Sequence, residues 1–183
     1  MDASSGTAST YTTEKDLVKS LARYLNIDPK GTRAALIVFN GRPSVISDFE
    51  SFRSLTEFES KVDEVPHYGG DRSVSDALRE AAGMFPKSPS SVSKVIFLVT
   101  SGKPLQPQDK NSAGDVINEL SAIGVRTYLA LVGPSAKIQD FRFLVDKTES
   151  VFTIESNGDV PKQVNQVGSY ILSESGRSLC INE

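Results

Sequence analysis

The chain has 183 residues, of which 38% are apolar and 23% are charged, and its formal net charge is -3. This length fits one domain with a single core, and the balanced composition excludes a disordered chain and a strongly basic nucleic-acid-binding protein. The longest apolar runs, residues 34–39 and 95–99, are too short to span a bilayer, and no signal-peptide pattern is present. We therefore expect one globular domain.

The first part of the chain predicts a helix followed by a hairpin. Apolar residues recur at helical spacing over residues 17–25, which predicts an amphipathic helix. Residues 33–39 form a nearly continuous apolar run, typical of a strand that is buried on both faces. Asn40-Gly41 then separates this run from the extended residues 45–49, which predicts an antiparallel pair at one edge of the sheet.

Helices and strands alternate along the rest of the chain. The apolar spacing predicts helices over residues 55–65, 73–85, 116–123, 138–145 and 160–171, and strands over residues 94–100, 126–132 and 151–154. We expect an exposed Pro/Gln loop over residues 103–108 and a loosely ordered tail over residues 173–183. The order predicts an α/β fold: a Rossmann-like, mostly parallel sheet with one antiparallel edge strand and helices on both faces.

Three polar loops hold the candidate site. They are residues 2–6, 69–73 and 99–103, and each leaves an apolar strand or precedes a helix. In an open α/β sheet such loops converge at one edge and form the binding site. The residues that we expect to contact a partner there are Asp2, Ser4, Asp71, Arg72, Ser101 and Lys103.

No catalytic motif is found in the sequence. The glycine patterns Gly-x-Gly-x-x-Gly, Walker and Gly-x-Ser-x-Gly are absent. The one histidine, His67, precedes the Gly69-Gly70 loop without a motif around Ser4 or Ser101, and we interpret it as a solvated loop residue. We expect neither enzymatic activity nor a cofactor. A small α/β hydrolase or nucleotide-binding enzyme is the alternative, which bound nucleotide or turnover would favour.

Four segments, in chain order, resemble the von Willebrand factor type A family. They are residues 33–40 (RAALIVFN), 69–78 (GGDRSVSDAL), 94–103 (KVIFLVTSGK) and 123–126 (IGVR). Within that family, the Gly-Gly-x-Arg loop and the Thr-Ser-Gly-Lys ending are similar to the N-terminal A domains of collagen VI chains. The resemblance covers essentially the whole chain.

The resemblance implies a function as well as a fold. It implies a secreted, non-enzymatic module of an extracellular matrix or adhesion protein, which binds matrix or cell-surface proteins through loops at the C-terminal edge of the sheet. An intracellular A-domain scaffold, as in some trafficking and repair complexes, is an alternative. Neither nucleic acid nor a membrane is an expected partner.

Metal-binding members of this family have an Asp-x-Ser-x-Ser loop, a threonine in the third loop and an aspartate after the fourth strand. These oxygen ligands surround a hard divalent cation. In this chain Asp2 and Ser4 match, but Gly6 replaces the second serine and Ser101 replaces the aspartate. The resemblance therefore implies a degenerate metal-ion-dependent adhesion site.

The threonine of the third loop is also replaced, by Asp71 or by Arg72. Arg72 adds a positive charge that opposes a cation and is able to pair with Asp2. We therefore expect no bound metal. Weak cation binding with help from Asp71 is one alternative, and a purely structural role of Asp2, Ser4 and Ser5 as loop and cap residues is another.

The family's central strand directly precedes the Asp-x-Ser loop, and Met1 corresponds only to its last residue. Such a buried strand of about six residues contributes about as much as a domain's net stability of ~5–15 kcal/mol. Three explanations are open: a chain truncated relative to a larger protein, a mispredicted start at Met1, or a strand supplied by another segment or chain. We favour the first two, and expect a chain extended upstream by about ten residues to melt at a higher temperature.

Cys180 is the single cysteine, so an intrachain disulfide is excluded. The family resemblance implies a bridge to a cysteine ahead of the first strand. The alternative is a free thiol in the tail.

Overall fold

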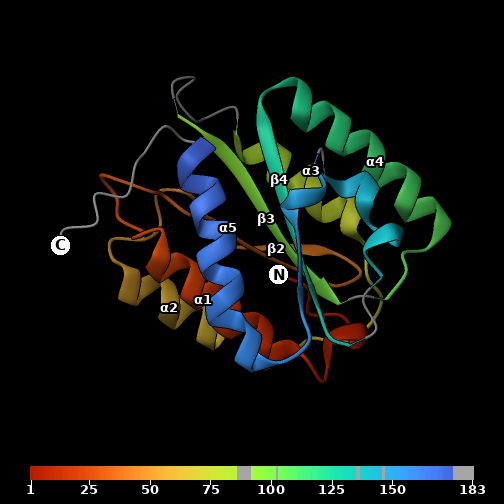
Figure 1. Cartoon of the computed structure of the whole chain (residues 1–183), viewed down its shortest axis with the longest axis horizontal. Helices are drawn as coiled ribbons and strands as arrows, with labels where there is room; N and C mark the ends of the chain where they lie inside the picture. Colours follow the sequence, from red (N-terminus) through yellow and green to blue (C-terminus); the bar gives the residue numbers. More distant parts are fainter. Residues whose placement is uncertain (86–91, 102, 135–136, 146, 175–183) are drawn as a thin grey trace.

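Two small sheets lie between two layers of helices (Figure 1). The computed structural model describes residues 1–85, 92–101, 103–134, 137–145 and 147–174. An antiparallel sheet pairs β1 (Leu36–Phe39) with β2 (Pro43–Ser47). A parallel sheet holds β3 (Lys94–Ser101), β4 (Val125–Val132) and β5 (Val151–Ile154), in that order. The α/β class and the antiparallel hairpin at Asn40-Gly41 are therefore confirmed.

The helices cover both faces of the parallel sheet. One layer contains α1 (Tyr11–Tyr24), α2 (Leu55–Glu64) and α5 (Val160–Glu174), and the other contains α3 (Val74–Met84) and α4 (Pro107–Ala122). Successive residues of a strand face opposite sides, and both sides of β3 are apolar: Leu98 packs with the α3/α4 layer and Val99 with the α1/α5 layer. This double burial explains why the strands read as continuous apolar runs.

The segment Met1–Ala3 joins the two sheets. Phe39 of β1 donates a hydrogen bond to the Met1 carbonyl (3.1 Å) and accepts one from the Ala3 amide (2.7 Å). On the other side, the Asp2 amide donates to the carbonyl of Val99 in β3 (3.0 Å). Met1–Ala3 therefore occupies the position of a strand between β1 and β3, but only at the C-terminal ends of both.

Several boundaries differ from the sequence-based expectation. The strand expected over residues 33–39 begins only at Leu36, because among the described residues only β2 and the short Met1–Ala3 segment lie beside it. The loop expected over residues 103–108 ends at Gln106, since α4 begins with Pro107 in its first turn, where proline needs no amide hydrogen.

The C-terminal third differs in two places. The helix expected over residues 138–145 is a pair of 3-10 turns, Ile138–Asp140 and Arg142–Leu144. Helix α5 continues to Glu174, so the first two residues of the expected tail are helical, and the remaining ones, including Cys180, lie outside the described residues. Within the described ranges, no helix is both long and apolar enough to cross a membrane.

Candidate functional site

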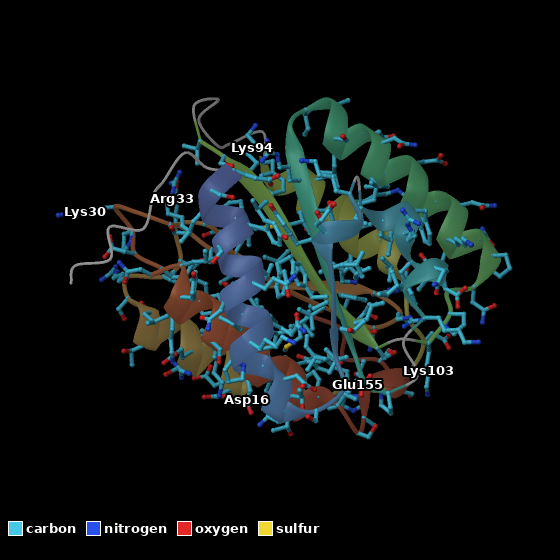
Figure 2. All side chains as sticks on the ribbon, viewed as in Figure 1. Asp16, Lys30, Arg33, Lys94, Lys103 and Glu155 are labelled. Carbon is cyan, nitrogen blue, oxygen red and sulfur yellow. The ribbon has the colours of Figure 1, made fainter. Side chains whose placement is uncertain are left out.

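The three polar loops meet where β1 and β3 end, at the edge of the sheet that Lys103 marks in Figure 2. Asp2 lies at their centre and is fully buried. Its Oδ1 accepts a hydrogen bond from the amide of Ser4 (2.9 Å), and its Oδ2 accepts one from the hydroxyl of Thr100 (2.5 Å). The convergence expected from the sequence is therefore found, and the carboxylate of Asp2 is held by both the first loop and β3.

Arg72 reaches into the same cluster from the third loop. Its Nη1 donates to Thr100 Oγ1 (3.2 Å) and to both the hydroxyl (3.1 Å) and the carbonyl (3.4 Å) of Ser101. Its Nη2 donates to the carbonyls of Lys103 (2.6 Å) and Pro104 (2.8 Å). One guanidinium group thus connects the third loop to the end of β3 and to the segment that follows it.

The guanidinium group also pairs with the buried carboxylate. Nη1 of Arg72 lies 3.7 Å from Oδ2 of Asp2, as the sequence suggested. Asp71, in contrast, is exposed, and no hydrogen bond or ion pair of its side chain is found among the described residues. Arg72 rather than Asp71 is therefore the third-loop residue that enters the cluster.

The other expected site residues divide into buried and exposed groups. Ser4 and Ser101 are buried and contribute to the packing of the loops. Lys103 is exposed, although its carbonyl accepts from Arg72. Gly6 lies beside them, because a Cβ atom there would come within 3.1 Å of Ser101 Oγ and 3.5 Å of Ser4 Oγ. A side chain at position 6 would thus point directly into the cluster.

The first and third loops are joined by main-chain contacts that require glycine. Ser5 exchanges hydrogen bonds with Gly70, its amide donating to the Gly70 carbonyl (3.0 Å) and its hydroxyl accepting from the Gly70 amide (2.8 Å). The Gly69 amide donates to Ala3 (2.8 Å). Gly69 and Gly70 have φ angles of 72° and 79°, a region that residues with a Cβ rarely adopt.

His67 has a structural role that the sequence did not reveal. Its Nε2 lies 2.8 Å from the carbonyl of Ser4 and 3.3 Å from the hydroxyl of Thr7, and its ring packs edge-on against Tyr11. The interpretation of His67 as a merely solvated loop residue is therefore wrong. The contacts join residues 56 to 63 positions apart, and no local pattern signals them.

The first turn of helix α3, which follows Arg72 in the chain, is held in place by contacts with neighbouring residues. Ser73 caps the helix, and the carboxylate of Asp109 on α4 accepts the amides of Val74 (3.0 Å) and Ser75 (2.8 Å). These first amides of a helix have no partner within it and favour a negative charge. Asn40 adds a further contact, since its carbonyl accepts the Ser73 amide (2.8 Å).

A second buried carboxyl group, that of Glu14, lies behind the site on α1. Burial raises the pKa of Glu14 to about 8, and the nearby charge of Asp2 raises it further, whereas the Met1 ammonium and the Thr10 hydroxyl oppose the shift. Thr10 donates to its Oε1 (3.1 Å), while Oε2 has no hydrogen-bond partner among the described residues. The site therefore contains, beside Asp2, a second buried carboxyl group whose pKa is raised.

These residues do not fit a hard divalent cation. Such an ion requires several oxygen ligands, usually with more than one carboxylate, in near-octahedral geometry. The Thr100 and Ser101 hydroxyls and Asp2 Oδ2 already face the guanidinium of Arg72. No group of three His, Cys, Asp or Glu side chains suited to a metal occurs in the described part of the chain.

Comparisons with solved structures show the same fold in several adhesion-type proteins. Proximal thread matrix protein 1 from the mussel byssus superposes with a TM-score of 0.79 at 25% identity, covering 93% of this chain and 44% of that one. A second form of that protein, with a zinc-occupied MIDAS motif, is 24% identical, with a TM-score of 0.79 and coverages of 92% and 43%.

The manganese-loaded TRAP protein of Plasmodium vivax has a TM-score of 0.74 at 18% identity, covering 91% of this chain and 70% of that one. The chain spans less than half of the mussel protein to which it is similar. Residues 1–167 match the von Willebrand factor type A domain, which covers every loop of the site. The chain therefore belongs to the von Willebrand factor type A domain family.

Proposed function

We propose that this chain is a non-enzymatic protein-binding domain of a secreted extracellular matrix or adhesion protein. It binds matrix or cell-surface proteins through the loops at the C-terminal edge of its sheet, without a metal ion. The observation that carries this proposal is the position of the Arg72 guanidinium, which pairs with Asp2 and donates to the oxygens of Thr100 and Ser101.

The guanidinium group supplies two of the effects that a bound cation would have. It places a positive charge beside the buried Asp2 carboxylate, and it joins the loops by hydrogen bonds. Because the charge is part of the chain, it is present whether or not divalent cations are available. A cation entering the same cluster would meet electrostatic repulsion from it.

The contacts with a partner fall to the exposed members of the predicted set. Asp71 and Lys103 are exposed, whereas Asp2, Ser4 and Ser101 are buried. The buried residues fix the loop conformation, and the exposed side chains provide the recognition surface. This division of roles predicts different effects of mutation. Changes at the exposed positions should weaken binding, and changes at the buried positions should lower the stability of the domain.

The comparisons support an extracellular setting. The mussel protein is a byssus matrix protein at 25% identity, and the loops 69–73 and 99–103 resemble those of collagen VI chains. A disulfide between Cys180 and a cysteine upstream of the first strand belongs to the same proposal.

Isothermal titration calorimetry with Mg²⁺ and Mn²⁺ tests the absence of a metal, and we expect no heat of binding. Binding to an immobilised panel of collagens, fibronectin and laminin is then measured with Mg²⁺ and again in EDTA. We expect equal binding in both buffers. A measurable heat of metal binding, together with loss of partner binding in EDTA, would instead establish a metal-dependent adhesion domain.

Two pairs of variants test the binding surface. Lys103→Ala and Asp71→Ala should weaken binding to the panel, whereas Lys162→Ala on α5 and Asp115→Ala on α4 are matched exposed controls away from the loops. Equal binding by all four variants would exclude the loop edge as the recognition surface. Hydrolysis or a bound nucleotide in the purified protein would contradict the non-enzymatic assignment.

A further inference from the structure

The turn that joins β1 to β2 contains the dipeptide Asn40-Gly41, and it lies against the third loop. The Nδ2 atom of Asn40 donates to the carbonyl of Gly69 (3.2 Å), and its main-chain carbonyl accepts the amide of Ser73 (2.8 Å). Gly41 faces the same loop, because a Cβ atom at this glycine would lie 3.6 Å from Cβ of Asp71. The turn is therefore the part of the hairpin that supports the third loop.

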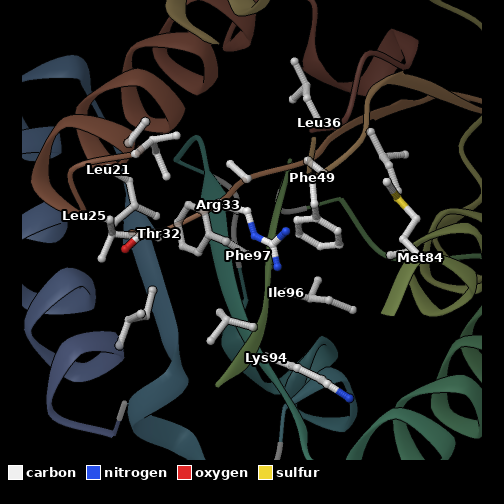
Figure 3. Close-up of a pocket in the computed structure, with 18 of the residues that line it drawn as sticks. Leu21, Leu25, Thr32, Arg33, Leu36, Phe49, Met84, Lys94, Ile96 and Phe97 are labelled. Carbon is white, nitrogen blue, oxygen red and sulfur yellow. The ribbon is translucent and has the colours of Figure 1, made fainter. Parts of the chain in front are cut away.

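The two strands on either side of this turn are anchored in the core. Val38 and Phe39 at the end of β1 are buried. Leu36, earlier in the same strand, and Phe49, beyond β2, line the apolar cavity drawn in Figure 3, and the ring of Phe49 packs against that of Phe85 (5.7 Å between centroids). Because packing holds the strands, a chemical change in the turn acts first on the third loop.

An asparagine that precedes a glycine is open to an attack on its own side chain. The main-chain nitrogen of the glycine bonds to the side-chain carbonyl carbon, the C–N bond of the amide breaks, and ammonia leaves with the proton of the glycine amide. A succinimide ring remains, and water opens it to aspartate or to isoaspartate, in which the main chain runs through Cβ. Glycine favours the first step, because it has no Cβ atom that obstructs the approach.

The folded turn holds Asn40 in a conformation suited to this reaction. Oδ1 of Asn40 accepts the amide of Arg42 (3.2 Å), so the side-chain carbonyl is folded back over the main chain at Gly41. A hydrogen bond to Oδ1 also stabilises the negative charge that this oxygen gains when the nitrogen attacks. The Gly41 amide makes no hydrogen bond among the described residues, and Gly41 is exposed to the water that opens the ring.

The other Asn-Gly pair of the sequence, Asn157-Gly158, has a different conformation. It begins a 3-10 turn, and the side-chain amide of Asn157 donates to Asp16 (3.2 Å). The main-chain amide two residues further on, that of Asp159, donates to the carbonyl of Ser156 (3.1 Å). The side-chain oxygen of Asn157 therefore does not receive the hydrogen bond that folds the side chain back in the hairpin turn.

Conversion of Asn40 would weaken the contacts between the turn and the third loop. A carboxylate at this position does not donate to the Gly69 carbonyl, and it places a negative charge against that oxygen and near Asp71. In isoaspartate, the additional main-chain carbon also displaces the carbonyl that accepts the Ser73 amide at the start of α3. Both changes reach the loop that carries Arg72.

We propose that Asn40 is a site of spontaneous deamidation in the folded protein, and that its conversion to aspartate or isoaspartate loosens the third loop and adds a negative charge beside it. The reaction consumes only water, so the converted fraction increases with the age of the molecule. The loop edge therefore changes with time without an enzyme or a second ligand. This modification does not depend on the function proposed for the loop edge.

The conversion is measured at both Asn-Gly pairs after the full 183-residue chain has been kept warm at neutral pH. Mass spectrometry of tryptic peptides detects the exchange of an amide for an acid. In the native chain, Asn40 should convert at least about fivefold faster than Asn157. In urea the two rates should become similar, because the folded conformation no longer distinguishes the sites. Equal rates in the native chain, or conversion of Asn40 only in urea, would overturn the proposal.

Gly41→Ala is the matched variant for the chemical step. Gly41 does not have a positive φ angle, and a Cβ atom there meets only an ordinary contact, so the variant should fold normally. Its Asn40 should convert at least about tenfold more slowly, because the methyl group obstructs the attacking nitrogen. Gly158→Ala should leave the rate at Asn40 unchanged. An unaltered rate in Gly41→Ala would contradict the route through the succinimide.

Asn40→Asp reproduces the charge of the product and tests its effect. Amide hydrogen exchange in residues 69–73 should be at least about fivefold faster in this variant, because the contact with Gly69 is lost. Asn157→Asp adds the same charge on the turn ahead of α5 and should not change exchange in these residues. The aged protein should show the faster exchange, and aged Gly41→Ala should not. Unchanged exchange in both Asn40→Asp and the aged protein would refute the link to the third loop.

Discussion

Nη1 of Arg72 lies 3.7 Å from Oδ2 of Asp2, and the exposed fractions of the two side chains are 11% and 0%. A carboxylate without solvent needs an opposite charge or hydrogen-bond donors, and Asp2 has both, from Arg72 and from Thr100. The pair connects the first loop to the third, although the two residues are far apart in the sequence. Its contribution to stability is measurable.

Arg72→Ala should lower the free energy of unfolding by about 2 kcal/mol, because it leaves the buried Asp2 carboxylate with fewer partners. Urea denaturation followed by circular dichroism measures this change. Arg79→Ala removes an arginine whose ion pair with Asp76 is half-exposed, and should cost less than about 1 kcal/mol. Equal costs for the two variants would contradict a special role of the Arg72–Asp2 pair.

Metal binding should be restored by three changes together: Gly6→Ser, Arg72→Thr and Ser101→Asp. They supply the missing oxygens and remove the guanidinium, so Mn²⁺ should raise the melting temperature of this variant by about 2–4 °C for each kcal/mol of binding linkage. The control retains Arg72 and carries only the other two changes, and it should not respond to Mn²⁺. A response of the unmodified protein would show that Arg72 does not exclude the cation.

Glu14→Gln should change the dependence of stability on pH. Burial raises the pKa of Glu14 from 4.5 to about 8, so the folded state retains a proton that the unfolded chain releases. This contribution is fully present below pH 4.5 and is lost as the pH rises through 8. Burial lowers the pKa of the Met1 ammonium from 8.0 to about 6, so its effect has the opposite sign between pH 6 and 8.

The amide of glutamine does not titrate, so the substitution removes the contribution of Glu14 and leaves that of the Met1 ammonium. The stability of Glu14→Gln relative to the unmodified protein should therefore rise by about 4 kcal/mol from pH 4.5 to pH 8. Thermal melts over this range measure the difference, and the exposed Glu119→Gln on α4 is the control. A difference that does not vary with pH would show that Glu14 ionises normally in the folded protein.

Gly168→Ala should destabilise the contact between α1 and α5. A Cβ atom at Gly168 would lie 2.4 Å or less from two ring carbons of Tyr24, so the ring must move, at a cost of about 2 kcal/mol. At Gly83 in α3 nothing lies within 4 Å of such a Cβ, and Gly83→Ala should be neutral or stabilising by up to about 1 kcal/mol. The midpoints of urea unfolding compare the two variants. Similar midpoints would show that the Tyr24 ring moves aside without a loss of stability.

The sequence was sufficient for elements whose signal is local. The Asn40-Gly41 turn predicted the hairpin, and the apolar run at residues 151–154 coincides with β5, because turn chemistry and burial act over a few residues. The residues that hold the site were less predictable. His67 contacts Ser4 from 63 positions away, and Asp109 caps a helix that begins 35 residues earlier.

The same distinction applies to the expected site residues. Their convergence followed from strand order, but whether Asp71 or Arg72 enters the cluster depends on the conformation set by Gly69 and Gly70. Thr100, which donates to Asp2 and accepts from Arg72, has no motif of its own. The roles assigned to Asp71 and Lys103 in partner binding remain predictions for the variants described above.

Met1–Ala3 has one more consequence. Asp2 belongs to the segment whose main-chain hydrogen bonds connect β1 with β3. The contacts that place Met1–Ala3 between the two strands therefore also place the Asp2 carboxylate against Thr100 and Arg72. Three residues of main chain thus set the relative position of the two sheets and of the loops at their edge.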